Sequence, residues 1–180
     1  MIEAATVEQS LLKQVRLHDG TLVTLRPIRP EDEPGLIAFH TRLSSDTAFQ
    51  RFHAPLPQLP ANWAHFLANV DYERRMAIVA LHGGQLISVA RYDYSETADE
   101  AEVAIVVQDE WQERGLGTIL MIELLGYAEA HGIGRFRAYV LAGNYRMLDM
   151  LSRVGNVLKR RTADGVVSLL FTPRPRIEAS

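Results

Sequence analysis

The residues best suited to chemistry surround one turn that contains two glycines, Gln112–Gly117. A short apolar, β-branched run over residues 102–107 precedes the turn, and apolar residues with helical spacing follow it from Thr118 to Ala130. A strand, a glycine turn and a helix start together form an anion site, because free backbone N–H groups point outward there and the helix dipole adds partial positive charge. The turn therefore predicts a ligand that carries phosphate.

Glu102 is the residue of the preceding strand with the clearest chemical potential. An ionisable side chain in an otherwise apolar strand needs a structural or functional reason. On a strand it shares one face with Ala104 and Val106, so its carboxylate can reach a cleft that begins near Val106. There it can collect a proton as a general base, with a pKa raised toward the operating pH by partial burial. The alternative is an edge carboxylate in a salt bridge with Arg91.

Other polar residues are weaker candidates. Glu100 shares the face of Glu102 and is the fallback base, although a solvated strand entry is the simpler interpretation. Asp71 can guide a cationic substrate, but a turn cap is the simpler role. Five histidines are scattered without metal-ligand spacing, namely His40, His53, His65, His82 and His131. We expect no metal site, and His53 is the histidine expected nearest to an acceptor.

Hairpins and helices must position these residues. Asp19-Gly20 and Asp164-Gly165 each lie between two strand-like segments and predict two-residue hairpins. The expected helices cover residues 30–43, 45–52, 61–69, 116–131 and 144–153. The other expected strands cover residues 76–81, 85–94, 100–107 and 136–141. Hairpins combined with two late crossover helices predict a mixed sheet covered by helices, not a purely parallel one.

Length and composition indicate one domain over residues 1–180, with 1–12 as an N-terminal arm and 173–180 as a C-terminal tail. The chain is 47% hydrophobic and 23% charged, has no cysteine, and carries a formal net charge of −3. The lack of cysteine excludes disulfides, thiolate metal sites and a cysteine nucleophile. The sequence has no basic tract of the kind that indicates nucleic-acid binding. No apolar stretch is long enough to span a bilayer, and the N-terminus does not resemble a signal peptide, so we expect a cytoplasmic protein.

Three phosphate-binding motifs compete for the glycine turn. A P-loop needs a lysine after its last glycine, whereas Thr118 directly follows Gly117. A dinucleotide fingerprint needs glycine or alanine where Leu120 stands, and it belongs in an early βαβ unit. The pyrophosphate loop of the GNAT acyltransferases, Q/R-x-x-G-x-G/A, fits at every position. A tight turn without a ligand is the remaining alternative.

The resemblance to the GNAT superfamily extends from about Val15 to Thr172. Within it, the chain is most similar to the catalytic domain of the Pat-type bacterial protein lysine acetyltransferases. The matching segments are Leu17–Gly20, Leu25–Asp32, Ser45–Phe52, Val89–Tyr92 and Ala101–Ala104. The resemblance implies an α+β GNAT fold with a mixed, mostly antiparallel sheet of roughly six to seven strands, splayed at the cofactor site and flanked by about four helices.

By that resemblance the ligand is acetyl-CoA, the acyl donor. Backbone N–H groups of Arg114–Thr118, with the side chain of Gln112 or Arg114, would hold its pyrophosphate. The pantetheine arm would lie in the splayed gap beside Ile105–Val107. Asn144 matches an asparagine that contacts the cofactor in many GNATs, or it only caps a helix. The expected cofactor-binding residues are Ile105, Val106, Val107, Gln112, Glu113, Arg114, Gly115, Leu116, Gly117, Thr118 and Asn144.

Acyl transfer to an amine assigns a role to Glu102. A lysine ammonium has a pKa of about 10.4 and must lose a proton to attack the thioester. Glu102 lies where Pat-like enzymes carry their catalytic glutamate and is the expected base. A strand N–H from Ile105–Val107 would meet the oxyanion. Many GNATs place an acid tyrosine where Leu151 stands here, so solvent would protonate the departing thiolate, with Tyr139 as an alternative.

The sequence thus predicts an acetyl-CoA-dependent N-acetyltransferase that works by direct attack in a ternary complex. A protein lysine is the favoured acceptor, for example on an acyl-CoA synthetase. A small-molecule amine acceptor and a non-catalytic acyl-CoA-binding sensor module are the alternatives. We expect a monomer or homodimer that binds neither nucleic acid nor membrane. Pat-type enzymes commonly carry a further regulatory domain, which we expect to be absent here or to lie in another chain.

Overall fold

The computed structural model describes residues 4–175. Its helices are α1 (Ala4–Leu11), α2 (Glu33–Thr41), α3 (Ser45–Phe52), α4 (Ala61–Ala68), α5 (Leu116–Ala130) and α6 (Tyr145–Val154), with single turns η1 (Pro30–Asp32) and η2 (Asp109–Trp111). Its strands are β1 (Lys13–Arg16), β2 (Leu22–Pro27), β3 (Arg75–His82), β4 (Gln85–Ser95), β5 (Glu100–Val107), β6 (Phe136–Leu141), β7 (Gly155–Ala163) and β8 (Val166–Pro173). The elements follow the predicted order along the chain.

All eight strands of the described residues form one sheet, in the order β1-β2-β3-β4-β5-β6-β8-β7. Neighbouring strands are antiparallel except β5 and β6, which are parallel. The predicted α+β class with a mixed, mostly antiparallel sheet is confirmed. The expected six to seven strands were too few, because both outer hairpins add their edge strands β1 and β7 to the sheet. The figure of about four helices implied by the resemblance was also too low, because the helices expected at residues 45–52 and 61–69 both form and the N-terminal arm adds α1.

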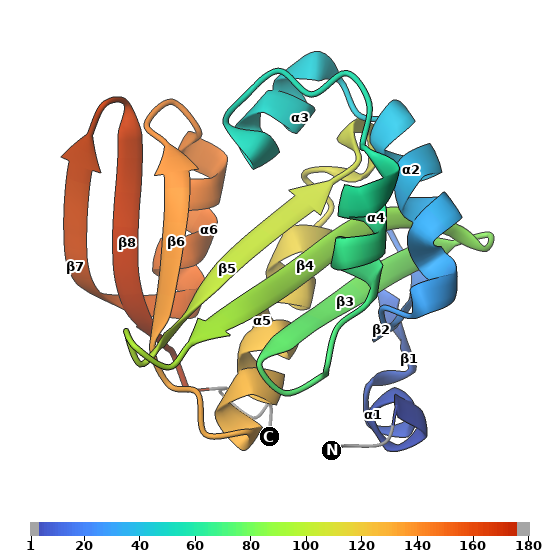
Figure 1. The fold of residues 1–180 in the computed structure, drawn as a ribbon, viewed down its shortest axis with the longest axis horizontal. Coiled ribbons are helices and arrows are strands. Elements are labelled where there is room, and N and C mark those ends of the chain that lie inside the picture. The colour runs from blue at the N-terminus through green and yellow to red at the C-terminus, as the bar shows by residue number, and fades with distance from the viewer. Residues whose placement is uncertain (1–3, 176–180) are drawn as a thin grey trace.

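Strands β5 and β6 separate soon after they meet, so the sheet opens like a V (Figure 1). They pair only at Ala101 with Phe136 and at Glu102 with Arg137. Within the described chain, residues 103–107 of β5 pair with β4 but with no strand on the other side. The predicted splay is therefore confirmed, and it leaves backbone polar groups that need another partner.

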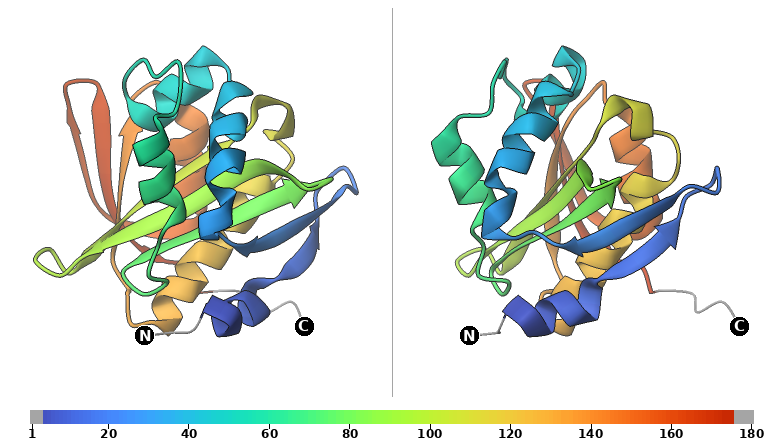
Figure 2. Two further views of the ribbon diagram at one scale, coloured as in Figure 1. Left: turned by 45° about the vertical axis from the view of Figure 1, so that its right-hand side comes forward. Right: turned by 90° about the vertical axis from the view of Figure 1, so that its right-hand side faces the viewer.

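Helices cover both faces of the sheet (Figure 2). On one face, α2 and α4 enclose a small core with buried Leu36, Phe39 and Val79. On the other face, α5 crosses β3, β4 and β5 and buries Leu120 and Leu124 in the larger core. Helix α3 lies across the open end of the V (Figure 1). The two cores hold β4 and β5 rigidly between them, which fixes the strand that carries Glu102.

The predicted arm at the N-terminus is helix α1, and its Val7 and Leu11 are buried in the larger core. Residues 1–3 lie outside the described part of the chain. At the other end, Pro173 still belongs to β8, and residues 176–180 of the expected tail lie outside the described residues. Between residues 4 and 175, no helix combines the length and the apolar character that a bilayer crossing requires.

Gly155, at the start of β7, is tightly enclosed. A Cβ atom there would lie 3.1 Å from Cγ of the buried Phe171, closer still to its Cδ2, and 3.2 Å from the carbonyl oxygen of Leu151. We therefore expect Gly155→Ala to lower the free energy of unfolding by about 1–3 kcal/mol through overpacking. Scanning calorimetry measures the change, with Gly134→Ala as control, because nothing lies within 4 Å of a Cβ atom at Gly134. Equal stability losses in both variants would contradict this assignment.

Candidate functional site

A cavity of about 320 Å³ opens where β5 and β6 separate. Strands β5 and β6 supply its side walls, α5 and α6 contribute to its base, and α3 and the start of α4 lie over it. The lining residues are Gln50, Arg51, Phe52, His53, Trp63, Glu102, Val103, Ala104, Ile105, Met121, Ala138, Tyr139, Val140, Met147 and Leu151. Glu102 lies in the wall of this cavity, but Val106, near which the cleft was expected to begin, does not line it.

Glu102 lies opposite Asp93 of β4 in the sheet register. It makes no hydrogen bond or ion pair with any residue that the structure describes. Neighbouring protein atoms displace part of its water and raise the pKa of Glu102, and the negative charge of Asp93 raises it further. Arg51 and His53 act in the opposite direction. An unpaired carboxyl group with a raised pKa in a cavity wall is suited to accept a proton.

The alternative salt bridge between Glu102 and Arg91 is not formed. Arg91 lies opposite Ala104 instead. Its Nε donates to the Asp93 carboxylate at 3.4 Å, and its Nη1 donates to the carbonyl oxygen of Leu67 at 3.3 Å. The sequence analysis missed the role of Asp93. The sequence feature that could have revealed this role is the spacing of Arg91 and Asp93, two residues apart on an otherwise apolar strand. This spacing places both side chains on the face of Glu102.

The two weaker carboxylate candidates are already occupied. Arg137 donates to both carboxylate oxygens of Glu100, with 2.9 Å between Nη2 and Oε2. These hydrogen bonds lower the pKa of Glu100, so it is a poor proton acceptor. Asp71 caps a turn, because its Oδ1 accepts the backbone N–H groups of residues 73–75. Glu102 thus has the least committed carboxylate of the three.

The glycine turn is the N-terminal end of helix α5. Gly115 adopts a left-handed conformation with a φ of 84°. The ring of His18, from the β1–β2 hairpin, lies against it, since a Cβ atom at Gly115 would be 2.6 Å from His18 Nε2. The first bond of the helix runs from the Ile119 N–H to the Gly115 carbonyl at 3.1 Å. The N–H groups of residues 116–118 therefore have no acceptor within the helix, which is the geometry that an anion site requires.

Two side chains of the glycine turn, those of Gln112 and Arg114, form hydrogen bonds within the protein. Gln112 Nε2 donates to the carbonyl oxygen of Val107 at 3.0 Å and to Thr47 Oγ1 at 3.2 Å. Arg114 Nη1 donates to Asp19 at 2.9 Å. In this structure the two side chains expected to help hold a pyrophosphate are thus used to connect the turn to β5, α3 and the first hairpin. The open backbone N–H groups are what the turn offers to an anion.

The three expected pantetheine-binding residues of β5 have different surroundings. Ile105 lines the cavity, whereas Val106 lines a smaller pocket on the opposite side of the strand. Val107 lies beside the helix start, with its Cγ2 3.6 Å from a Cβ atom built at Gly117. The edge of β5 therefore leads from the cavity directly to the glycine turn. An extended ligand can contact both.

Asn144 caps helix α6, because its Oδ1 accepts the Met147 N–H at 3.2 Å. Glu113 of the turn lies 3.3 Å from Arg146 near the start of the same helix. Leu151, at the position of the acid tyrosine of many GNATs, lines the cavity and is buried. The cap interpretation of Asn144 is confirmed, and contact with a cofactor stays a prediction.

The end of helix α3 and the following His53 contribute residues 50–53 to the cavity, of which only Arg51–Phe52 and His53 stood out in the sequence. Ser44 caps the start of α3, because its Oγ accepts the Thr47 N–H at 3.1 Å. Asp109 of η2 binds the same end, through Ser44 Oγ at 2.6 Å and Thr47 Oγ1 at 2.8 Å. The cavity residues of α3 are thereby tied to the chain that leads into the glycine turn. Only the fold reveals this connection, because the two segments are far apart in sequence.

Within residues 4–175, no group of three or more His, Cys, Asp or Glu side chains is placed to hold a metal ion. Of the histidines, His53 lines the cavity, as expected. His65 Nδ1 lies 2.7 Å from a carboxylate oxygen of Glu33, and His82 packs on Trp111. His18, which the sequence analysis did not single out, is the histidine at the glycine turn.

Known proteins share this arrangement. A family model described as an acetyltransferase (GNAT) domain matches residues 23–157. The chain is 32% identical over 162 residues to acetyltransferase Pat of Mycolicibacterium smegmatis, covering 88% of this chain but 48% of that protein, about half its length. It is 31% identical over 152 residues to acetyltransferase PA5475 of Pseudomonas aeruginosa, covering 82% of each. The crystal structure of the GNAT domain of S. lividans PAT superposes with a TM-score of 0.83 at 35% identity, over 89% of this chain and 96% of that domain.

Proposed function

The chain belongs to the GNAT family of acetyltransferases, and on that premise we propose that it transfers the acetyl group of acetyl-CoA to the side chain of a protein lysine, with Glu102 as general base. One observation carries the proposal. An unpaired carboxyl group with a raised pKa lines the cavity at the open edge of β5. Without such a group, the cavity and the glycine turn would support binding of an acyl-CoA equally well without catalysis.

The reaction needs a neutral amine. Glu102 accepts a proton from the ammonium group, directly or through a water molecule, as the nitrogen attacks the thioester carbonyl carbon. The C–N bond forms and the carbonyl electrons move to oxygen. The nitrogen then loses its second proton to solvent, and the return of the electrons breaks the C–S bond and leaves the amide. A backbone N–H of Ile105–Val107 meets the oxyanion. The splayed edge of β5 supports this assignment, because its backbone has no strand partner on the β6 side.

Acetyl-CoA occupies the V between β5 and β6 in this proposal. Its pyrophosphate lies on the N–H groups of Arg114–Thr118, where the helix dipole of α5 favours negative charge. Its pantetheine arm follows β5 past Val107 and Ile105 to Glu102, and Asn144 lies at the far wall. The closeness of Val107 to the helix start supports this path, because it makes the cavity and the anion site continuous.

The departing CoA thiolate needs little help, since a thiol has a pKa of about 8.5 and its anion is a good leaving group. Solvent can protonate it. Among the residues that line the cavity, Tyr139 carries the only hydroxyl group, and its side chain is exposed. Leu151 cannot donate a proton. If the reaction uses a hydroxyl group of the cavity wall as the acid, Tyr139 is the residue placed to supply it.

A protein acceptor is favoured by the surface around the cavity. Phe49 of α3 and both Trp63 and Phe66 of α4 are exposed large apolar side chains. Trp63 also lines the cavity. Exposed aromatic residues are enriched where proteins bind other proteins. The similarity to Pat-type enzymes points to the same class of acceptor, and the proposal places the reaction in the cytoplasm, where acetyl-CoA is available.

The test incubates the protein with acetyl-CoA and three acceptor classes: lysine-containing proteins from a cell lysate, lysine peptides, and small primary amines. Released CoA is measured with a thiol reagent, and the products are identified by mass spectrometry. We expect fastest turnover with protein lysines. Turnover with small amines alone would overturn the protein lysine as acceptor and make a small-molecule amine the acceptor instead. Acetyl-CoA binding without turnover on any acceptor would overturn the enzymatic proposal in favour of an acyl-CoA sensor.

A further inference from the structure

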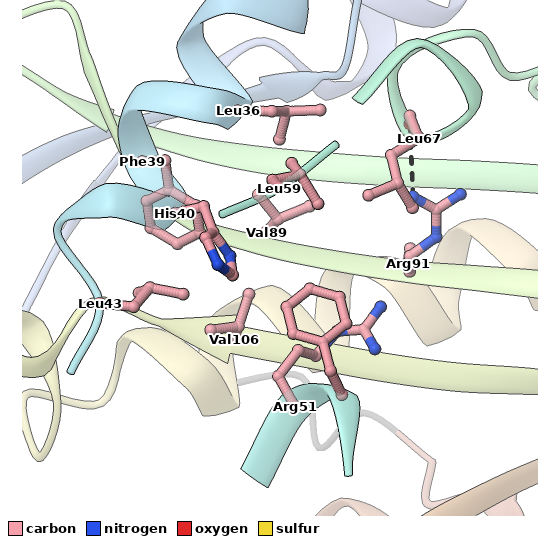
Figure 3. Close-up of a pocket in the computed structure, with 11 residues that line it drawn as sticks. Leu36, Phe39, His40, Leu43, Arg51, Leu59, Leu67, Val89, Arg91 and Val106 are labelled. Atoms are coloured by element: carbon pink, nitrogen blue, oxygen red, sulfur yellow. Dashed lines mark hydrogen bonds between the residues drawn. The ribbon is translucent and has the colours of Figure 1, made fainter. Parts of the chain in front are cut away.

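A second, smaller pocket adjoins the main cavity on the face of the sheet that α2, α3 and α4 cover (Figure 3). Its volume is about 40 Å³. Arg51 and Phe52 line both spaces, so a group in the main cavity can extend into the pocket. The other walls are apolar except for His40 and Arg91, and His40 Nε2 is already hydrogen-bonded to the Leu56 carbonyl at 2.6 Å.

Arg91 has hydrogen-bonding capacity that the protein does not use. Its side chain is only 5% exposed. Nε and Nη1 have long contacts, at 3.4 Å to Asp93 and 3.3 Å to the Leu67 carbonyl (the latter drawn in Figure 3). Nη2 is buried and has no hydrogen-bond partner among the described residues. A buried charged donor without a partner is costly, so the native state of this arginine is expected to include a further acceptor.

Arg51 extends from α3 toward the side of the pocket that holds Arg91 (Figure 3). Its guanidinium lies over the Phe52 ring, 4.9 Å from the centroid, and makes no hydrogen bond or ion pair with a described residue. The surrounding protein atoms and then the positive charge of Arg91 lower the pKa of Arg51 to about 10. Both arginines thus line the same small pocket, and the charge of Arg91 disfavours that of Arg51.

The charges around this space do not balance. Arg51, Arg75 and Arg91 contribute three positive charges, while Asp93 and Glu102 contribute two negative charges when both are ionised. Asp93 is already shared between Arg75, at 2.9 Å, and Arg91, at 3.4 Å. One positive charge is left over, and two when Glu102 holds a proton. An anion entering from the main cavity would restore the balance.

We propose that this pocket is a subsite for a carboxylate group of the substrate, bound by Nη2 of Arg91 and the guanidinium of Arg51. Planar guanidinium groups match a carboxylate in geometry and charge. A volume of about 40 Å³ has room for roughly three water molecules. This is enough for a carboxylate and an adjoining carbon, and the apolar walls suit that carbon. The subsite deepens the proposed function by naming the substrate class.

Two parts of the substrate can supply this carboxylate. One is the far end of a dicarboxylic acyl group on CoA, and the other is an acidic group next to the acceptor amine. Both enter from the main cavity past Arg51, the residue that lines both spaces. Arg91 would bind the carboxylate in the same way in the two cases. One experiment therefore tests whether the pocket binds a carboxylate, and another tests which part of the substrate supplies it.

Binding is tested by calorimetric titration of the whole chain with succinate and with its neutral analogue succinamide. We expect saturable binding of succinate, at least tenfold weaker in Arg91→Met and in Arg51→Met, and no binding of succinamide. Arg74→Gln is the matched control, because Arg74 is an exposed arginine in a surface ion pair with Glu96, and it should bind succinate like the wild type. Unchanged affinity in Arg51→Met and Arg91→Met, or no succinate binding by the wild type, overturns the proposal. If Arg91→Met does not fold, Arg51→Met, on the more exposed α3, decides.

The source is tested by two ratios of kcat/KM in the wild type and in Arg51→Met. The first compares succinyl-CoA with acetyl-CoA, and the second compares a lysine peptide flanked by aspartate with one flanked by asparagine. A tenfold or larger fall of the first ratio assigns the carboxylate to the acyl group, and a similar fall of the second assigns it to the acceptor. Active enzyme with both ratios unchanged overturns the subsite but not the acetyltransferase. An enzyme inactive with every donor overturns the proposed function, while the succinate titration still decides the subsite.

Discussion

Replacement of Glu102 by glutamine is expected to lower kcat for acetyl transfer by about 10²–10⁴-fold, the usual contribution of a general base. Glutamine keeps the size and the hydrogen-bonding oxygen of the side chain but cannot accept the proton of the attacking amine. Because Glu102 makes no hydrogen bond or ion pair with a described residue, the change should disturb the fold little. Steady-state release of CoA measures the rate, and calorimetry with CoA should show affinity within about twofold of the wild type.

Glu100→Gln is the matched control. It makes the same chemical change two residues earlier on the same face of β5, at a carboxylate that is occupied by Arg137. We expect it to cost some stability and to leave kcat within a few-fold of the wild type. A fall of kcat in Glu100→Gln equal to that in Glu102→Gln would contradict the assignment, since it would trace the loss to the strand and not to the base.

The pH dependence gives a second measurement on the same carboxyl group. A base works only when it is ionised, so kcat/KM rises as the pH passes upward through the pKa of Glu102. Since surrounding protein and Asp93 raise that pKa, the rise should lie above the ordinary glutamate value of about 4.3. Asp93→Asn removes a negative charge and should move the rise to lower pH. The residual activity of Glu102→Gln should lack this rise. If the rise in kcat/KM persisted in Glu102→Gln, it would have to be assigned to the titration of another group.

Substitution of Gly115 by alanine is expected to raise the KM for acetyl-CoA at least tenfold. The φ of 84° at Gly115 is a left-handed conformation that costs an L-residue about 1–2 kcal/mol. The added Cβ atom would also lie 2.6 Å from His18 Nε2, so the turn or the hairpin must move. Either movement displaces the N–H groups at the start of α5 that the proposal assigns to the pyrophosphate.

Gly132→Ala is the control for backbone strain alone. Gly132 follows the other end of α5 with a φ of 82°, and nothing lies within 4 Å of a Cβ atom there. It should lose similar stability and keep its KM for acetyl-CoA. The double variant His18→Ala, Gly115→Ala removes the clash and should recover part of the affinity. Equal KM values for the Gly115→Ala and Gly132→Ala variants would show that the turn does not hold the donor.

Much of the fold could be predicted from local signals. Helix α3 forms over the expected residues 45–52, and Ser44 caps its start. Asp164-Gly165 joins β7 and β8 as the predicted two-residue hairpin, whereas β1 and β2 are antiparallel as expected but have residues 17–21 between them. These features depend on the conformational preferences of a few adjacent residues, which a sequence displays directly. All eight strand segments were expected from the sequence, and only their assembly into one sheet of eight strands exceeded the roughly six to seven that the resemblance implied.

The candidate site also has parts that the sequence predicts and parts that only the structure shows. By itself, the sequence determined the strand with one glutamate, the glycine turn and the helix start, because period-two alternation and glycine's access to left-handed backbone are local properties. Only the tertiary structure decided that β5 leaves β6 after two residue pairs and that Asp93 lies opposite Glu102. It also decided that Arg51 and Arg91 share one pocket. Register and close approach between distant segments depend on how two cores pack around the sheet, and no short stretch of sequence encodes that packing.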